Sequence, residues 1–219
     1  MPKKNVLLKL SFADSFTILN GIFGLFSIFF ILKGYVQYSF IFILMAVLSD
    51  GMDGIVARRY GGYLGEYMDE FSDTVSFCVA PCIFSYIIYN MPENLPFFLA
   101  TSLFLIFGIL HLINYHLNKK EYFIGLPTPA SAIMVATLSY LKIPFWGLIL
   151  IFLILSFIMV LPFNYPRIER HFSVIACIII FLAMSGENVF ILLLLFSTSV
   201  YIIAGPLYLW IVKGVLKKS

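Results

Sequence analysis

The chain has 219 residues, of which 62% are hydrophobic and only 11% are charged. A water-soluble domain of this size carries about 25% charged residues, so the composition excludes both an ordinary soluble globular protein and a disordered one. The formal net charge is only +3, which argues against the strongly basic surface of a nucleic-acid-binding protein. We therefore expect an integral membrane protein whose partners include membrane lipid and no nucleic acid.

Charged residues, prolines and glycines divide the chain into apolar runs of the length that a membrane-spanning helix needs, about 20 residues. In chain order the expected spans are residues 15–33, 37–58, 66–90, 95–117, 127–141, 144–162, 172–185 and 188–212. The connections are short and no internal repeat is visible. The sequence therefore predicts one all-α domain, residues 1–219, with about eight transmembrane helices.

The N-terminal residues combine lysines with apolar residues at helical spacing. Val6, Leu7 and Leu10 fall on one side of a helix, so we expect a short amphipathic helix on the membrane surface. The alternative is a basic leader that anionic lipids hold without regular structure. Asp14 or Ser15 is expected to cap the first span.

The basic residues predict the orientation of the chain, because Lys and Arg collect in cytoplasmic loops. With eight spans, twelve of the fourteen Lys and Arg residues fall on the side of the N-terminus, and only Lys33 and Lys142 fall on the other side. We therefore expect a multi-pass protein of the cell membrane with both termini in the cytoplasm.

The acidic residues are concentrated in one part of the sequence. Six of the eleven lie between Asp50 and Asp73, in the cytoplasmic halves of the second and third spans. Asp50 and Asp53 share one helix face, as do Asp69 and Asp73. If the two helices pack as an antiparallel hairpin, these carboxylates face one another at two depths, the deeper about 12 Å from the loop at 1.5 Å per residue.

Four facing carboxylates within a membrane require a polar cavity or a cation, since each costs roughly 2.5–3.5 kcal/mol on insertion scales. Arg58 and Arg59 offset part of the charge, but two hard divalent ions, Mg²⁺ or Mn²⁺, suit oxygen ligands better. Such a site suits phosphoryl chemistry on a lipid. Two alternatives stay open: a structural cluster that is protonated or paired with arginine, and a pathway for transported cations.

The spacing of these residues resembles the signature of the CDP-alcohol phosphatidyltransferase family. Here the signature reads Asp50-x-x-Asp53-Gly54-x-x-Ala57-Arg58 and then Gly65-x-x-x-Asp69-x-x-x-Asp73. The connection between Arg58 and Gly65 is shorter than is usual in the family, and Gly61 and Gly62 permit a tighter turn.

Further segments resemble the serine-accepting branch of this family, the phosphatidylserine synthases. They are Thr17-x-x-Asn20, Ser76-Phe77-Cys78-Val79-Ala80-Pro81, the segment 123–132 (FIGLPTPASA) and Asn164-Tyr165-Pro166-Arg167. The branch commonly has two arginines in the segment that here reads HLINYH, residues 111–116. The resemblance implies a six-helix core within residues 14–167, preceded by the leader 1–13 and followed by two extra spans in 168–219.

The resemblance also implies roles for individual residues. Two divalent ions would be held by Asp50, Asp53, Asp69 and Asp73. The CDP-lipid would be bound by Gly54, Ala57 and Arg58, with Thr17, Asn20 and Gly65 as further contacts. Asp73 would act as the general base. Lys119, Lys120 and Arg167 are candidate contacts for the acceptor or a phosphate, with an equally good interpretation as ordinary cytoplasmic charges.

The activity that the resemblance implies is transfer of a phosphatidyl-type group from a CDP-activated lipid to L-serine. The donor would be CDP-diacylglycerol or CDP-archaeol, the products would be the serine phospholipid and CMP, and the enzyme would be a homodimer. Inositol phosphate or glycerol phosphate as acceptor is the nearest alternative. A divalent-cation transporter is the alternative from another class, although the outer halves of the spans carry almost no polar residues.

Overall fold

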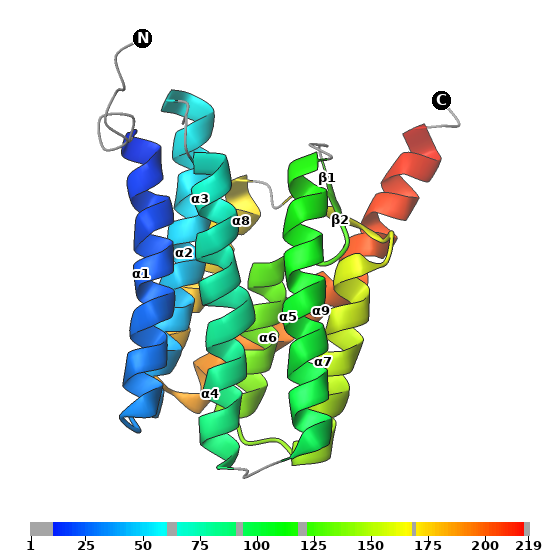
Figure 1. Ribbon diagram of the computed structural model, residues 1–219. Coiled ribbons are helices and arrows are strands. Elements are labelled where there is room, and N and C mark those ends of the chain that lie inside the picture. The colour runs from blue at the N-terminus through cyan, green and yellow to red at the C-terminus, as the bar shows by residue number, and fades with distance from the viewer. Residues whose placement is uncertain (1–10, 61–64, 91–93, 118–121, 168–169, 217–219) are drawn as a thin grey trace.

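The computed structural model describes residues 11–60, 65–90, 94–117, 122–167 and 170–216. Helices make up most of this part of the chain and run roughly side by side (Figure 1). In chain order they are α1 (Phe12–Leu32), α2 (Val36–Tyr60), α3 (Gly65–Asp73), the π-helix η2 (Thr74–Val79), α4 (Ala80–Tyr89), α5 (Leu95–Leu117), α6 (Thr128–Tyr140), α7 (Phe145–Val160), α8 (Arg170–Ala183) and α9 (Asn188–Leu216). Since α3, η2 and α4 follow one another without a break, each of the eight expected spans has a helical counterpart.

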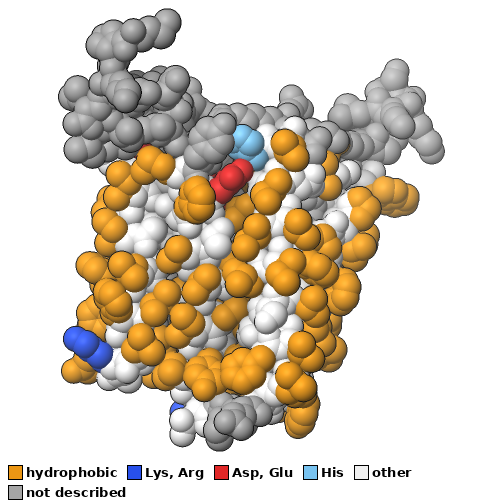
Figure 2. All heavy atoms as spheres, viewed as in Figure 1, with side chains coloured by type: hydrophobic (Ala, Val, Ile, Leu, Met, Phe, Trp, Pro, Cys, Tyr) orange, Lys and Arg blue, Asp and Glu red, His pale blue; other side chains and the backbone are white. Residues whose placement is uncertain are grey.

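The outer surface of the bundle is apolar, as a membrane requires. By length and composition, four described segments can cross a bilayer: Asp14–Leu32, Met68–Tyr89, Leu95–Leu117 and Asn188–Ile211. Shorter apolar helical segments lie within α2, α7 and α8. Figure 2 shows hydrophobic side chains over the whole visible face between the two ends of the bundle. The expectation of an all-α integral membrane protein is confirmed.

Helix α6 forms the centre of the bundle. Eleven of its thirteen residues are buried, and it packs against α2, α4, α7 and α9. Ala132 and Ala136 have no exposed surface, and such small side chains let neighbouring helices approach closely. The hydroxyl groups of Ser139 and Ser85 lie 2.7 Å apart and join α6 to α4. A buried, relatively polar helix is compatible with the membrane because other helices surround it.

The first helix begins earlier than the sequence suggested. Ser11 is its N-cap: the Ser11 hydroxyl accepts a hydrogen bond from the backbone N–H of Asp14, and the Asp14 carboxylate accepts one from the backbone N–H of Ser11. This reciprocal pair is a capping box. The expectation that Asp14 or Ser15 caps the span is therefore wrong. The proposed amphipathic helix lies almost entirely outside the described residues.

Two short strands were not expected from the sequence. Strand β1 (Tyr122–Ile124) pairs with β2 (Asn164–Pro166) in antiparallel fashion, with Phe123 opposite Tyr165. The pair fastens the segment before α6 to the segment after α7. Gly125 follows β1 with a φ of +88°, and a Cβ there would collide with the carbonyl oxygen of Met159. Only glycine fits this turn.

Helix α1 packs closely against α3 and η2 through small residues. The position that a Cβ would take at Gly21 lies 3.0 Å from the Ser72 hydroxyl, and at Gly24 it lies 2.7 Å from the Cα of Ser76. The Ser76 hydroxyl donates a hydrogen bond of 2.8 Å to the carbonyl oxygen of Asn20. Glycine and serine thus allow two helix backbones to meet and to exchange a hydrogen bond.

Replacing Gly24 with alanine tests this contact. The new methyl group would push the backbone of Ser76 away, and overpacking of this kind costs about 1–3 kcal/mol. We expect Gly24→Ala to lower the thermal unfolding temperature of the purified protein in detergent. Gly147→Ala is the matched control, because its Cβ would meet only the end of the Ile143 side chain at 3.9 Å. An unchanged unfolding temperature for Gly24→Ala would contradict the close contact.

Candidate metal centre

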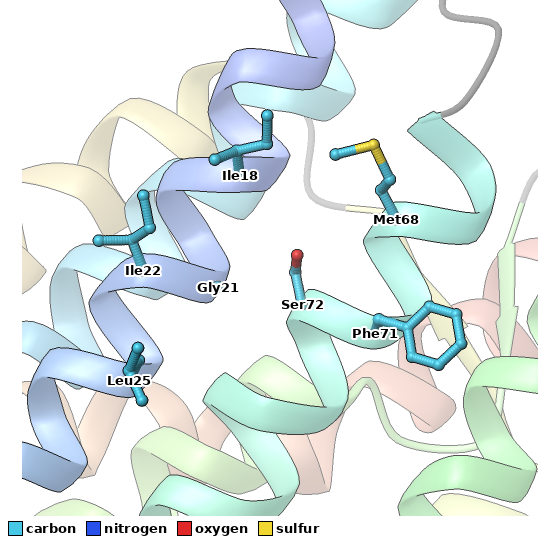
Figure 3. Close-up of a pocket in the computed structure, with 7 residues that line it drawn as sticks. All are labelled: Ile18, Gly21, Ile22, Leu25, Met68, Phe71 and Ser72. Atoms are coloured by element: carbon cyan, nitrogen blue, oxygen red, sulfur yellow. The ribbon is translucent and has the colours of Figure 1, made fainter. Parts of the chain in front are cut away.

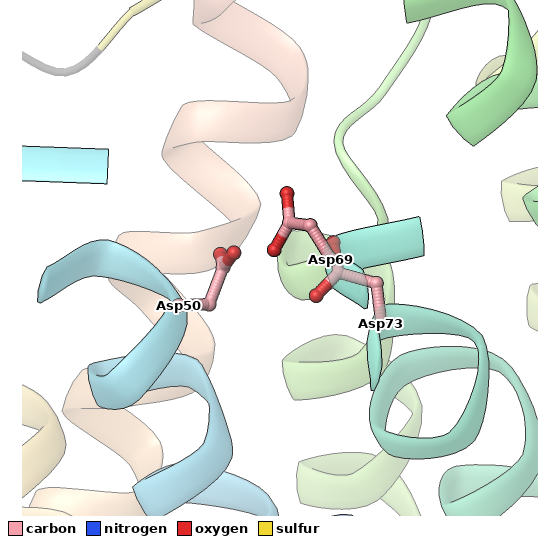
Figure 4. A group of neighbouring side chains, drawn as sticks. All are labelled: Asp50, Asp69 and Asp73. Carbon is pink, nitrogen blue, oxygen red and sulfur yellow. The ribbon is translucent and has the colours of Figure 1, made fainter. Parts of the chain in front are cut away.

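Three aspartates from two helices converge at one end of the bundle. Asp50 comes from α2, and Asp69 and Asp73 come from successive turns of α3. Each offers a carboxylate oxygen, and these oxygens all lie within 4.8 Å of one another. Figure 4 shows the three side chains pointing toward a common centre. Residues that are separated in the sequence by about 20 positions therefore form one oxygen-rich site.

The arrangement fits a divalent cation. Oxygen ligands lie about 2.0–2.1 Å from Mg²⁺, so neighbouring ligands of one ion are about 3 Å apart and opposite ones about 4 Å. The three oxygens need only small adjustments to reach these separations. Asp73 is 6% exposed, and Asp50 and Asp69 are partly buried. Since carboxylates this close repel one another when ionised, a cation stabilises their charged forms.

Asn20 of α1 contacts the most buried of the three carboxylates. Its Nδ2 donates a hydrogen bond of 2.7 Å to Oδ1 of Asp73. Asn20 has no exposed surface, and Thr17, one turn before it, is 3% exposed. A hydrogen bond to an ionised group is about twice as strong as one between neutral groups. The sequence signal for Asn20 was the resemblance of Thr17-x-x-Asn20 to a segment of the family, which did not reveal its partner.

The helix surface at Gly51, which follows Asp50 in the sequence, is open. Apart from its chain neighbours and the backbone of its own helix, no described atom lies within 4 Å of the position that a Cβ would occupy at Gly51. Several expected site residues follow on the same helix or in the loops, and their side chains are outside the described part of the structure. They are Asp53, Gly54, Ala57 and Arg58 of α2, Gly65 at the start of α3, and Lys119 and Lys120.

An apolar groove opens between α1 and α3 (Figure 3). It has a volume of about 370 Å³ and is lined mainly by aliphatic and aromatic side chains. Ser72, beside Asp73 in the sequence, contributes to its wall, and Leu25 and Phe71 are exposed on its outer side. The groove is thus an apolar depression that is open on the lipid-facing side of α1 and α3.

The chain changes from an α-helix to a π-helix directly after Asp73. In η2 three consecutive residues, Ser76, Phe77 and Cys78, are all buried. A regular amphipathic helix does not bury three residues in a row, because they point in different directions. The helices α1, α5 and α6 all pack against the π-helix. Single π-turns inside helices are frequent at functional sites.

Two histidines of α5 contact neighbouring helices at this end of the bundle: His116 contacts α3, and His111 contacts α7. His116 Nδ1 lies 3.4 Å from a carboxylate oxygen of Glu70, the neighbour of Asp69 on α3. His111 is 4% exposed, and its Nδ1 lies 2.9 Å from the carbonyl oxygen of Met159. The first contact joins α5 to the helix that carries the carboxylates. Figure 2 shows an acidic side chain beside a histidine at this end.

Arg167 follows β2 and lies beside two neighbouring aromatic rings. Its guanidinium carbon is 5.9 Å from the centroid of the Tyr115 ring and 5.7 Å from that of Phe123. Its Nη2 also donates a hydrogen bond of 3.1 Å to the Tyr115 hydroxyl. The Nε atom is buried and has no hydrogen-bond partner among the described residues. The β1–β2 pair brings these residues together from distant parts of the sequence.

Residues 10–163 of this chain match the family described as CDP-alcohol phosphatidyltransferase. The chain belongs to this family. It is also similar to a CDP-diacylglycerol–serine O-phosphatidyltransferase of Methanocaldococcus jannaschii. The two are 29% identical over 193 residues, which cover 88% of this chain and 92% of the relative. The chain is thus a membrane-embedded CDP-alcohol phosphatidyltransferase, and the family's use of divalent metals agrees with the acidic group.

The Asn20 contact makes a prediction about this site. Hydrogen bonds to charged groups contribute about 1.5–3 kcal/mol, equivalent to a factor of about 10–150. We expect Asn20→Leu to reduce CMP release from a CDP-lipid by about this factor and to weaken Mn²⁺ binding. Thr101→Val is the control, because the Thr101 hydroxyl donates to backbone carbonyls of its own helix. Equal activities of the two variants would show that Asn20 has no role in the site.

Proposed function

We propose that this chain transfers the phosphatidyl-type group of a CDP-activated lipid to L-serine and releases CMP. The observation that carries the proposal is the convergence of Asp50, Asp69 and Asp73 at the positions of the family signature. The choice of serine is supported by the serine-branch segments of the sequence and by the name of the similar archaeal enzyme. The donor is CDP-diacylglycerol or CDP-archaeol.

Four aspartates hold two divalent ions, Mg²⁺ or Mn²⁺, in this proposal. Asp53 lies three residues after Asp50 on α2 and so belongs to the same helix face. It would complete the set formed by Asp50, Asp69 and Asp73. When bound, the metals neutralise the diphosphate and stabilise the attacking and leaving oxygens.

The CDP moiety binds along α2, beside the carboxylates. Gly54, Ala57 and Arg58 follow Asp50 on this helix, and the open space at Gly51 supports a ligand on this surface rather than a packed helix. Gly65 begins the facing helix. Thr17 and Asn20 would act from α1, where Asn20 orients Asp73. The groove between α1 and α3 suits one apolar chain of the lipid, because its lining is apolar and it opens to the bilayer.

The reaction requires a base to activate the acceptor. The serine hydroxyl oxygen attacks the phosphorus that carries the lipid, the bond from this phosphorus to the CMP oxygen breaks, and Asp73 takes the hydroxyl proton. The hydrogen bond from Asn20 holds one oxygen of Asp73 in place. The first requirement for a general base is geometric, and a carboxylate that is held in one orientation supports this role.

We also propose that the site faces the cytoplasm and that the enzyme forms a homodimer. Lys33 follows the last residue of α1 and Lys142 precedes α7, so both lie at the end of the bundle opposite the carboxylates. The start of α1 and the end of α9 lie at the same end as the start of α3 (Figure 1). This distribution supports an orientation in which both termini and the active site are cytoplasmic.

Asp73→Asn tests the base. General-base catalysis contributes about 10²–10⁴-fold, so we expect the variant to lose at least two orders of magnitude in CMP release. Binding of the CDP-lipid, measured by calorimetry in nanodiscs, should fall much less because asparagine keeps one oxygen ligand. Wild-type turnover in this variant would exclude Asp73 as the base.

The choice of acceptor is tested by comparing L-serine, inositol phosphate and glycerol phosphate. Purified protein with a CDP-lipid and Mn²⁺ or Mg²⁺ should release CMP rapidly only with serine, and removal of the metal with EDTA should abolish release. Stimulation by one of the other alcohols would reject serine and keep the family assignment. In sealed liposomes, metal flux without CMP release would instead indicate a cation transporter.

A further inference from the structure

A proline interrupts the hydrogen bonds of the last helix. Pro206 lies inside α9, within the segment Asn188–Ile211 that can cross a bilayer. Proline has no backbone N–H, and its ring displaces the carbonyl group four residues earlier, which here belongs to Ile202. Inside a bilayer no water replaces the lost partner of a carbonyl group, so the loss costs free energy. The Ile202 carbonyl therefore needs a donor from outside α9.

Tyr165 of strand β2 supplies this donor. Its hydroxyl donates a hydrogen bond of 3.1 Å to the carbonyl oxygen of Ile202, and Tyr165 is only 1% exposed. Gly205 makes room for the ring, because a Cβ at this position would lie 3.0 Å from Cδ1 of Tyr165. Two successive residues of α9 thus act on one tyrosine: Gly205 admits its ring, and Pro206 frees the carbonyl that its hydroxyl binds.

A second tyrosine joins the same two elements in the opposite direction. The hydroxyl of Tyr201 in α9 donates a hydrogen bond of 3.2 Å to the carbonyl oxygen of Pro166 in β2. The ring centroids of Tyr165 and Tyr201 lie 5.7 Å apart. Each element therefore donates a hydroxyl to a backbone carbonyl of the other. We call this arrangement of Tyr165, Pro166, Tyr201 and Ile202 the tyrosine joint.

The tyrosine joint is connected to the metal centre through the centre of the bundle. Strand β2 pairs with β1, and the chain continues from β1 into α6, which packs against η2. A Cβ at Gly108 of α5 would lie 2.5 Å from Sγ of Cys78 in η2 and 3.8 Å from Cγ2 of Thr128, the first residue of α6. The start of α6 and η2 thus meet at one point of α5, and η2 directly follows Asp73.

We propose that Tyr165 is a positioning residue whose hydroxyl replaces the hydrogen bond that Pro206 removes from α9. The tyrosine joint then holds the β1–β2 pair, and with it the start of α6, against the helix that carries Asp73. In this way α9, which lies outside the residues 10–163 that match the family, helps to fix the geometry of the metal centre. The inference uses the activity of the family and does not depend on serine as the acceptor.

A double-mutant cycle with Tyr165→Phe and Pro206→Ala tests the joint. Tyr165→Phe keeps the ring and leaves the Ile202 carbonyl without its donor, and loss of one such bond should lower the thermal unfolding temperature by about 2–4 °C. Pro206→Ala restores the N–H that bonds to Ile202 within the helix. In this second background we therefore expect Tyr165→Phe to lower the unfolding temperature by about 1 °C or less.

Steady-state CMP release by the same four full-length proteins in nanodiscs tests the effect on the metal centre. We expect Tyr165→Phe to lower kcat about fivefold and to change the KM for the CDP-lipid less than about twofold, because it shifts the site without contacting substrate. The double variant should recover most of the lost kcat. General destabilisation predicts the opposite, since two independent destabilising changes add.

Tyr201→Phe is the matched control, because its hydroxyl belongs to the same joint but bonds to Pro166. Its effect on the unfolding temperature should be the same with and without Pro206→Ala. Equal losses for Tyr165→Phe in both backgrounds would overturn the proposal, and so would wild-type kcat in a Tyr165→Phe variant with a lowered unfolding temperature. Pro206→Leu restores the same N–H and replaces Pro206→Ala if that variant does not fold.

The two proposals fail in different ways. If the wild type releases no CMP with serine, the proposed acceptor is wrong, and the cycle is measured with the alcohol that does support release. The unfolding temperatures test the joint without any substrate.

Discussion

The hydrogen bond between Asn20 and Asp73 is the contact on which the geometry of the site depends. A carboxylate inside an apolar bundle needs a polar partner, and α1 supplies one from a span that is otherwise almost entirely hydrophobic. The amide reaches Asp73 only because Gly21 and Gly24 let α1 approach α3 and η2 closely. Packing and electrostatics therefore act together: small residues set the distance between the helices, and the distance permits the bond.

The bundle shows which features of a membrane protein can be predicted from local sequence. Long apolar runs predicted the helices well, because a span must be apolar over a fixed length whatever its neighbours are. The cap at Ser11 was missed because an aspartate inside the first turn resembles a cap when only its type is considered. The β1–β2 pair joins three residues to three residues about 40 positions away, and no periodicity can develop over so short a distance. The π-helix likewise depends on contacts with three other helices.

The part of the site whose residues lie close together on one helix could be predicted from the sequence. The contacts between residues that are far apart in the sequence could not. The i, i+4 spacing of Asp69 and Asp73 placed both on one face, and the acidic concentration indicated that Asp50 would join them. The sequence marked Asn20 only by its resemblance to a known segment, without the partner that gives it a role. Tyr115 and Arg167 are 52 positions apart, and they meet because α5 packs against α7 and β1 pairs with β2.

The groove between α1 and α3 has a kinetic consequence. Because the groove opens sideways and has an apolar lining, the apolar chain of a substrate can enter it from within the membrane plane and need not leave the bilayer. Moving such a chain from the bilayer into water would cost about 0.8 kcal/mol of free energy for each CH₂ group. The concentration that governs encounter with an enzyme of this architecture is thus the mole fraction of donor in the membrane plane. Diluting the donor with inert lipid slows such an enzyme even when the amount of donor per volume of solution is constant.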